Sequence, residues 1–347
     1  MTQVSADGIR FDFRAEGGVI EAPTVTRDGR DVAPLHRAPW VGTGEAMPQD
    51  AAPHMAWLGG DFFCAPFAIA ADGVPLHGWP ANAEWDVAAA SGGMLEAVLT
   101  RDVQGARVTK TLRLRDGHPF VYQRHVFEGG AGAVPVANHA NVALPRGGLI
   151  RASPKAAWRT PPAPQEGDPA RGRSALRYPA TAADPSAFPG ADGPVDLARY
   201  PWGPAHEDFV SGIEEPGRAF GWTAVTRPVE GDLFLSLRDP RALPMTMLWH
   251  SNGGRDYAPW SGRHRGCLGV EEGAAAHMLP DWLEGMGPGA LLLGGRAEVR
   301  HVIGAWPWPS GAPVVGIEPE GDVLRVEGGC GTVARLPFDA GFLDGVL

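Results

Sequence analysis

Cysteine is scarce in this sequence, with only Cys64, Cys267 and Cys330 among 347 residues. The three are odd in number and far apart, which excludes a disulfide framework and a zinc knuckle with paired ligands. A reducing compartment fits this usage best, so we expect a cytoplasmic protein. Hydrophobic residues make up 44% of the chain, enough for a sizeable core that needs neither metal nor disulfide.

Long apolar runs and an excess of basic charge are also missing. No stretch approaches the roughly 18 uninterrupted apolar residues that a spanning helix needs. The first residues, MTQVSADGIRFDF, lack the basic and apolar regions of a signal peptide. The formal net charge is −10, whereas nucleic acids and anionic membranes attract basic surfaces. We therefore expect no nucleic-acid partner and no membrane association.

The usual cofactor and hydrolase motifs are absent as well. The sequence contains no GxxxxGK[ST], no strand followed by GxGxxG, no GxSxG and no HExxH. We therefore expect no nucleotide cofactor and no bound metal. One alternative stays open, because imidazoles from separate strands can converge on an ion, and His77, His139 and His250 are the candidates.

What the chain has in abundance is turns. Its 48 glycines and 34 prolines are scattered without a fixed period, as is typical of β-rich proteins. Segments between them alternate apolar and polar residues over strand-like lengths. No segment of comparable length keeps helical spacing, so we predict an all-β fold. Strands are expected at 9–13, 94–100, 108–114, 120–127, 233–237 and 323–326.

Segment 151–199 differs from the rest, being rich in Pro, Ala, Gly and Asp with little periodicity. This composition predicts a long irregular surface excursion. A linker would separate two independent cores, whereas the candidate site residues lie on both sides of this segment. We therefore expect a single domain over residues 1–347.

Three segments carry side chains suited to chemistry. In PLHGWPANAEWD (75–86), His77 stands in a region that Pro80 makes unsuitable for a helix or a central strand. A histidine on such a loop can point into a cleft, although a plain aromatic-covered turn is the commoner outcome. In VPVANHANVAL (134–144), Asn138, His139 and Asn141 interrupt a strand-like pattern, and the amides can hold an imidazole or bind hydroxyls.

The third segment, 247–273, combines aromatic and polar residues in a predicted loop that leads into a strand. Sugar rings lie on aromatic faces while their hydroxyls bond to polar side chains, so this mixture is typical of carbohydrate sites. A solvated loop with incidental aromatics is the competing interpretation. The residues are Trp249, His250, Asn252, Arg255, Asp256, Tyr257, Trp260, Arg263 and His264.

A strand over 267–271 would place Cys267, Gly269 and Glu271 on one face. If that face lines a cleft, Glu271 lies at its floor, where desolvation raises a carboxyl pKa toward values useful for a general base. An exposed glutamate at the end of the strand is the alternative, and Glu272 suits that description.

The order of these segments resembles the aldose 1-epimerase (galactose mutarotase) family and its hexose-phosphate epimerase relatives. The resemblance spans residues 57–273 and rests on the shared order of four short motifs. They are GGDFFCAPF at 59–67, HGWPANAEW at 77–85, NHAN at 138–141 and LGVEEG at 268–273.

The resemblance implies a large antiparallel β-supersandwich of the galactose mutarotase-like type, with a sugar on the concave face of one sheet. It makes His139 the acid that protonates the ring oxygen and Glu271 the base at the anomeric hydroxyl, while His77 holds the sugar. We expect further sugar contacts from Asn138, Trp249, Asp256, Trp260 and Arg263.

We therefore expect an aldose 1-epimerase-like isomerase without a cofactor, as a monomer or homodimer. The chain departs from the family pattern in Ala140 after His139, in Glu272 after Glu271, and in the absence of an arginine from GGDFFCAPF. These departures keep a non-catalytic carbohydrate-binding or sensing protein open as the alternative. A free, acidic or phosphorylated sugar remains possible, with Arg255, Arg263 and Arg265 as candidates for binding a phosphate.

Overall fold

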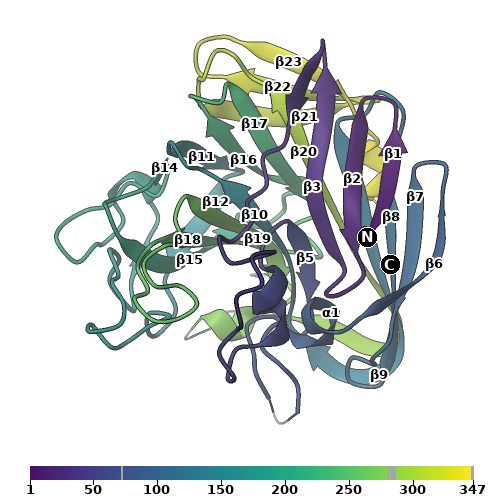
Figure 1. Ribbon diagram of the computed structural model, residues 1–347. Helices are drawn as coiled ribbons and strands as arrows, with labels where there is room; N and C mark the ends of the chain where they lie inside the picture. Colours follow the sequence, from purple (N-terminus) through teal and green to yellow (C-terminus); the bar gives the residue numbers. More distant parts are fainter. Residues whose placement is uncertain (72, 280, 282–286, 345–347) are drawn as a thin grey trace.

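The computed structural model describes residues 1–71, 73–279, 281 and 287–344. Two large antiparallel sheets pack face to face, and a small third sheet near the C-terminus lies against the second (Figure 1). The predicted all-β supersandwich is therefore confirmed. Among the described residues, no helix is long and apolar enough to cross a membrane.

The first sheet has eleven strands in the described part of the chain, in the order β1-β2-β3-β5-β10-β19-β18-β15-β12-β13, with β4 beside β3. The strands are β1 (Thr2–Ala6), β2 (Ile9–Arg14), β3 (Val19–Arg27), β4 (Arg30–Val32), β5 (Asp61–Cys64), β10 (Val136–Ala143), β12 (Lys155–Arg159), β13 (Thr181–Ala182), β15 (His206–Glu214), β18 (Met245–Asn252) and β19 (Cys267–Ala274).

Within the described residues, the second sheet has the order β14-β11-β16-β17-β20-β9-β8-β7-β6 and the third β21-β22-β23. Their strands are β6 (Trp85–Ser91), β7 (Met94–Leu99), β8 (Ala106–Arg113), β9 (Phe120–Val134), β11 (Gly148–Ala152), β14 (Arg199–Tyr200), β16 (Gly221–Arg227), β17 (Asp232–Arg238), β20 (Leu291–Pro307), β21 (Val314–Glu320), β22 (Val323–Gly328) and β23 (Val333–Pro337). The helical elements are α1 (Gly78–Asn82) and the 3₁₀ turns η1 (Pro53–Trp57), η2 (Pro185–Ala187), η3 (Ala276–Met278) and η4 (Ala340–Phe342).

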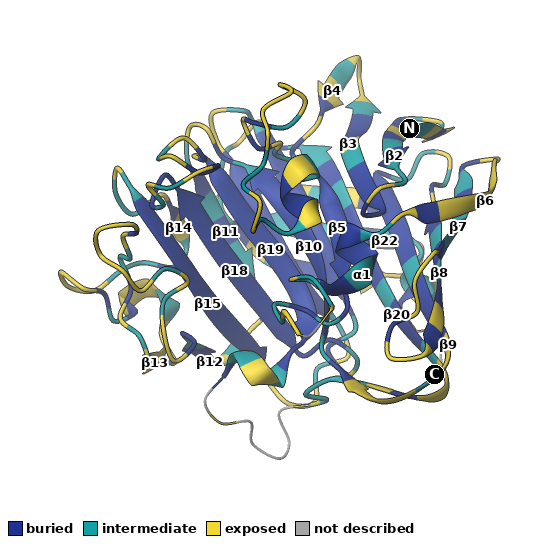
Figure 2. Ribbon diagram, turned by 60° about the horizontal axis from the view of Figure 1, so that its bottom comes forward, coloured by how far each residue is buried: buried dark blue, intermediate teal, exposed yellow. Residues whose placement is uncertain are grey.

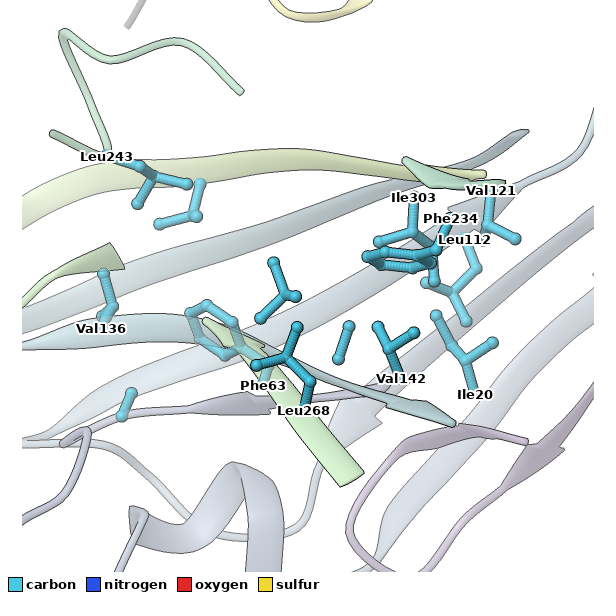
Figure 3. Packing of buried hydrophobic residues seen from close by; sticks show 14 of the residues in the cluster. Ile20, Phe63, Leu112, Val121, Val136, Val142, Phe234, Leu243, Leu268 and Ile303 are labelled. Carbon is cyan, nitrogen blue, oxygen red and sulfur yellow. The ribbon is translucent and has the colours of Figure 1, made fainter. Parts of the chain in front are cut away.

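The main core fills the space between the two large sheets. Phe63 and Leu268 of the first sheet pack in the same cluster as Val121, Phe234 and Ile303 of the second (Figure 3). Because side chains alternate along a strand, the neighbours of these first-sheet residues point to the opposite face. That opposite face carries the candidate site.

Loops cover the outer face of the first sheet, so its central strands are buried on both sides. Figure 2 shows β10, β15, β18 and β19 side by side and buried along their length. A second apolar cluster joins Phe62 and Trp249 of this face to Trp40, Met55 and Trp260 of the covering segments. The strands that position the site are thus packed between the main core on one face and the covering segments on the other.

The six expected strands are confirmed as β2, β7, β8, β9, β17 and β22, but two local predictions are wrong and a third is incomplete. Residues 247–252 form part of β18, because their apolar members pack on both faces rather than facing solvent. Segment 151–199 contains β12, which pairs with β15, as well as irregular chain. Pro80 lies inside the short helix α1, which it can do because the first helical turn needs no amide donor there.

An ionic network also lies between the large sheets. Glu272 accepts hydrogen bonds from Thr223 and Thr246 and pairs with Arg238, whose Nη1 is 2.8 Å from Oε2. Arg238 pairs in turn with Glu214. The expectation that Glu272 ends its strand as an exposed carboxylate is wrong, because its side chain points into this fully buried network.

His125 is a buried histidine of the same core that opposes stability in acid. Its ring stacks on Phe63, with centroids 3.8 Å apart, and neither ring nitrogen has a hydrogen-bond partner among the described residues. Burial, and then the charge of Lys110, lowers its pKa well below the ordinary value. The folded protein therefore keeps this imidazole neutral at a pH where the unfolded chain protonates it.

We expect His125→Phe to stabilise the protein increasingly as the pH falls. A lowered folded-state pKa means that stability is complete above about pH 6.5 and is lost as the pH drops from there toward the folded pKa. The stability difference between variant and wild type should therefore grow by about 2 kcal/mol between pH 7 and pH 5. Urea unfolding of both proteins at pH 7 and pH 5 measures this stability difference. A difference that does not change with pH would contradict the prediction that His125 is kept neutral in the folded protein.

Candidate active site

His139 and Glu271 face each other across the pairing of β10 with β19. They are directly opposed in register, and Nε2 of His139 lies 3.2 Å from Oε1 of Glu271. Gly269 leaves the space that the carboxylate occupies, because a Cβ there would lie 2.7 Å from Oε1. Phe62 of β5 pairs with His139 from the other side and stacks on its ring at 4.5 Å. The sheet itself therefore sets the geometry of the His139–Glu271 pair.

His77 reaches the same place from the loop before α1. Its backbone has φ +69° and ψ +8°, a left-handed conformation that non-glycine residues seldom adopt, and Gly78 follows with φ +70°. A Cβ at Gly78 would lie 2.0 Å from the carbonyl oxygen of Ala65, so only glycine fits. This tight turn puts the His77 ring 5.5 Å from that of His139.

His54, in η1, is a third histidine at this site. The Asn82 amide donates from Nδ2 to the carbonyls of Leu76 and Gly78, which turns its Oδ1 toward His54. Nδ1 of His54 lies 3.1 Å from that oxygen and must carry the proton, so Nε2 has a free lone pair. His77 has the other tautomer, because its Nδ1 accepts from the Ala68 amide at 3.4 Å, which leaves the proton on Nε2.

These side chains line a cavity of about 300 Å³, at the lower end of the range for small-molecule sites. His54, His77, His139 and Glu271 supply polar groups to its wall. The remaining wall is largely apolar and aromatic, as is usual for small-molecule pockets. It includes Met55, Leu58, Phe67, Leu76, Phe209, Trp249, Trp260 and Met278.

Burial sets the protonation of the central pair. It raises the pKa of the Glu271 carboxyl well above its ordinary value and lowers the pKa of His139 to about 3. Near neutral pH His139 is therefore neutral, and burial favours the protonated form of Glu271. Within the described residues, Nδ1 of His139 and Oε2 of Glu271 are buried without a hydrogen-bond partner.

A second carboxylate fixes the aromatic wall. Glu207 of β15 accepts from the Trp249 indole at 2.5 Å and pairs with Arg255 at 3.0 Å. The Arg255 guanidinium also lies 4.3 Å from the ring centroid of Trp260. These contacts hold both indoles against the cavity while balancing the charge of Arg255.

The structure brings together five of the eight residues expected at the site and places three elsewhere. His77, His139, Glu271, Trp249 and Trp260 line the cavity. Asn138 does not, because it neighbours His139 along β10 and so points to the opposite face, into the core. Asp256 and Arg263 lie on the covering loop, where they pair with Arg173 and Glu45.

The alternative of a metal held by His77, His139 and His250 is wrong. His250 points from β18 into the space between the sheets, where its ring stacks on Trp202 and Tyr200. It therefore faces away from the cavity that the other two histidines line.

Sequence reasoning missed His54, Phe67, Phe209 and Glu207. His54 precedes a Met-Ala-Trp run with no distinctive motif, and only the distant Asn82 reveals its role. Glu207 lies between His206 and Asp208 at the polar start of β15, HEDFVSGIE, and nothing in that pattern distinguishes a buried carboxylate from an exposed one. Gln165 of the irregular segment also reaches the cavity wall, which sequence periodicity does not predict.

The sequence matches no protein-family model, and no curated protein matches it. Several solved structures, by contrast, match its fold. A protein from Escherichia coli K12, provisionally assigned as an aldose 1-epimerase, superposes with a TM-score of 0.59 at 16% identity, covering 88% of this chain and 98% of that one. A galactose mutarotase related enzyme from Lactobacillus acidophilus gives 0.54 at 10% identity, covering 88% and 97%.

A third structure, from Klebsiella pneumoniae subsp. pneumoniae and also provisionally assigned as an aldose 1-epimerase, gives a TM-score of 0.52 at 13% identity, covering 88% of this chain and 79% of that one. At these identities the likeness concerns the fold. The chain therefore has the fold of the galactose mutarotase-like superfamily, as its motif order predicts.

Proposed function

We propose that the protein is an aldose 1-epimerase-like isomerase that interconverts the anomers of a small sugar. The observation that carries this proposal is the buried His139–Glu271 pair, whose atoms lie 3.2 Å apart at a cavity with aromatic walls. The fold shared with proteins assigned to aldose epimerisation supports it. A positioned acid and base are what opening a cyclic hemiacetal requires.

In the proposed reaction, Glu271 removes the proton from O1 of the sugar while His139 protonates the ring oxygen O5. The C1–O5 bond breaks and C1 becomes a carbonyl carbon. Rotation about C1–C2 and the reverse proton transfers close the ring as the other anomer. O1 and O5 are bonded to the same carbon, so a base and an acid on facing strands can reach both.

The proton count of the pair suits this reaction. The reaction needs Glu271 as a carboxylate base and His139 as an imidazolium acid, and moving one proton from Glu271 to the adjacent His139 produces both, although burial favours the neutral form of each group in the empty cavity. Each turnover takes one proton at O1 and returns one at O5, so the pair ends with the proton it began with. Positioned acids and bases of this kind contribute about 10² to 10⁴-fold each to the rate.

The other cavity groups suit binding of the hydroxyls. His77 offers an N–H donor and His54 an acceptor, by the tautomers that Ala68 and Asn82 select. Trp249 and Trp260 give apolar surfaces for the sugar C–H face. His77 can therefore hold the sugar during ring opening, as the family resemblance implies.

Polarimetry of mutarotation on a panel of aldoses tests the proposal. We expect the wild type to accelerate the approach to anomeric equilibrium for at least one small aldose. The matching methyl glycoside, which has no O1 proton and cannot open, should compete without reacting. Binding of sugars with no acceleration for any aldose would instead identify a non-catalytic carbohydrate-binding protein.

A further inference from the structure

Two imidazoles outside the proposed sugar site have unexplained free nitrogens. His36, which follows β4, and His264, which precedes β19, meet edge to face with ring centroids 4.9 Å apart. Nε2 of each is buried and has no hydrogen-bond partner in the described part of the chain. The His264 side chain is almost wholly buried. Such unsatisfied nitrogens are costly unless they serve another purpose.

A hydrogen-bond relay sets the tautomer of His264. Ser251 donates to Oε2 of Glu207 at 2.8 Å, so its oxygen accepts from Nδ1–H of His264, which lies 2.7 Å away. Nε2 of His264 therefore presents a lone pair. A carboxylate acting through a hydroxyl on the far nitrogen is the outer-shell arrangement that orients metal-binding histidines.

Cys267 completes a group of three donors. One ring nitrogen each of His36 and His264 and the Cys267 sulfur all lie within 4.8 Å of one another. Oδ1 of Asn141 lies 3.9 Å from the same sulfur.

We propose that His36, His264 and Cys267 form a zinc-binding site, with Asn141 or water as the fourth ligand. Tetrahedral zinc with Zn–N near ~2.0 Å and Zn–S near ~2.3 Å holds its donors about 3.3 to 3.6 Å apart. The three donors therefore need to approach one another by at most about 1.5 Å. Thiolate with imidazole is a ligand set that zinc favours, and the Cys267 proton leaves to solvent on binding.

The ion would stabilise the wall of the cavity rather than act on the sugar. Its ligands come from the chain after β4, from the loop between β18 and β19, and from β19 itself. The His264 ring stacks on Trp249 at 5.4 Å and meets Trp260 edge to face at 5.1 Å. Binding would tie the covering loop to the sheet behind these two indoles. This proposal departs from the expectation that the chain binds no metal, and it does not depend on the proposed sugar chemistry.

Titration of the metal-free protein with Co²⁺ tests the site directly. We expect one Co²⁺ per chain, a thiolate-to-cobalt charge-transfer band in the near ultraviolet, and displacement of that band by Zn²⁺. Cys267→Ser should abolish the band, whereas Cys64→Ser, a control at another buried cysteine of the same apolar cluster, should keep it. Ser251→Ala should weaken Zn²⁺ binding about 10- to 100-fold.

Circular dichroism establishes that each variant is folded. Should Cys267→Ser fail to fold, the half-buried His36 provides a second test, because His36→Gln should shift the cobalt spectrum and weaken binding. The proposal is overturned if folded wild-type protein shows no charge-transfer band, or if the band persists in Cys267→Ser.

Discussion

Replacing Glu271 by glutamine should lower kcat/KM for anomer exchange about a thousandfold, within the range of about 10² to 10⁴ that a positioned base contributes. Glutamine keeps the shape of the side chain but cannot take the O1 proton. The fold should not suffer, because burial already favours the neutral carboxyl at this position. We therefore expect the free energy of unfolding to stay the same or to rise slightly.

Polarimetric rates at equal concentrations of folded protein measure this effect. Sugar binding by Glu271→Gln, followed by isothermal titration, should persist, since His54, His77 and the aromatic wall remain. Wild-type activity in this variant would remove Glu271 from the reaction. A variant that binds no sugar at all would show that Glu271 acts in binding instead.

Replacing the neighbouring Glu272 by glutamine should lower stability and leave activity unchanged. We expect a loss of about 3 kcal/mol in the free energy of unfolding. Arg238 is fully buried and pairs with both Glu272 and Glu214. Removing one carboxylate leaves Arg238 and the nearby Lys155 opposed by Glu214 alone, so buried positive charge is left uncompensated.

Unfolding Glu272→Gln and the wild type in guanidinium chloride measures this difference in the free energy of unfolding. The activity per folded molecule should stay near the wild-type value. The two glutamates are adjacent in sequence but lie on opposite faces of β19. Each variant is therefore the control for the other. Unchanged stability in Glu272→Gln would mean that the Arg238 network contributes little to folding.

Alternation within single strands was the most predictable part of this protein. The pattern of 267–271 correctly placed Cys267, Gly269 and Glu271 on one face. The same alternation, applied along 134–144, separates His139 from Asn138 and would have excluded Asn138 from the cavity. Motif order then predicted the superfamily fold.

Contacts between distant strands were beyond the reach of local patterns. The opposition of His139 and Glu271 depends on the register of β10 with β19, which no local pattern specifies. The burial of Glu272 depends on Arg238 of the other sheet. His54 is recognisable only through its contact with Asn82. Tertiary pairing, rather than propensity, determines each of these positions.

The proposed function requires the His139–Glu271 pair to open and close a sugar ring. Saturation-transfer NMR on an aldose at neutral pH tests it most directly, because irradiating one anomeric proton reports its exchange with the other anomer at equilibrium. We expect transfer that increases in proportion to wild-type protein and falls to the buffer rate in Glu271→Gln. Transfer no faster than in buffer, for every aldose that the protein binds, would contradict the claim.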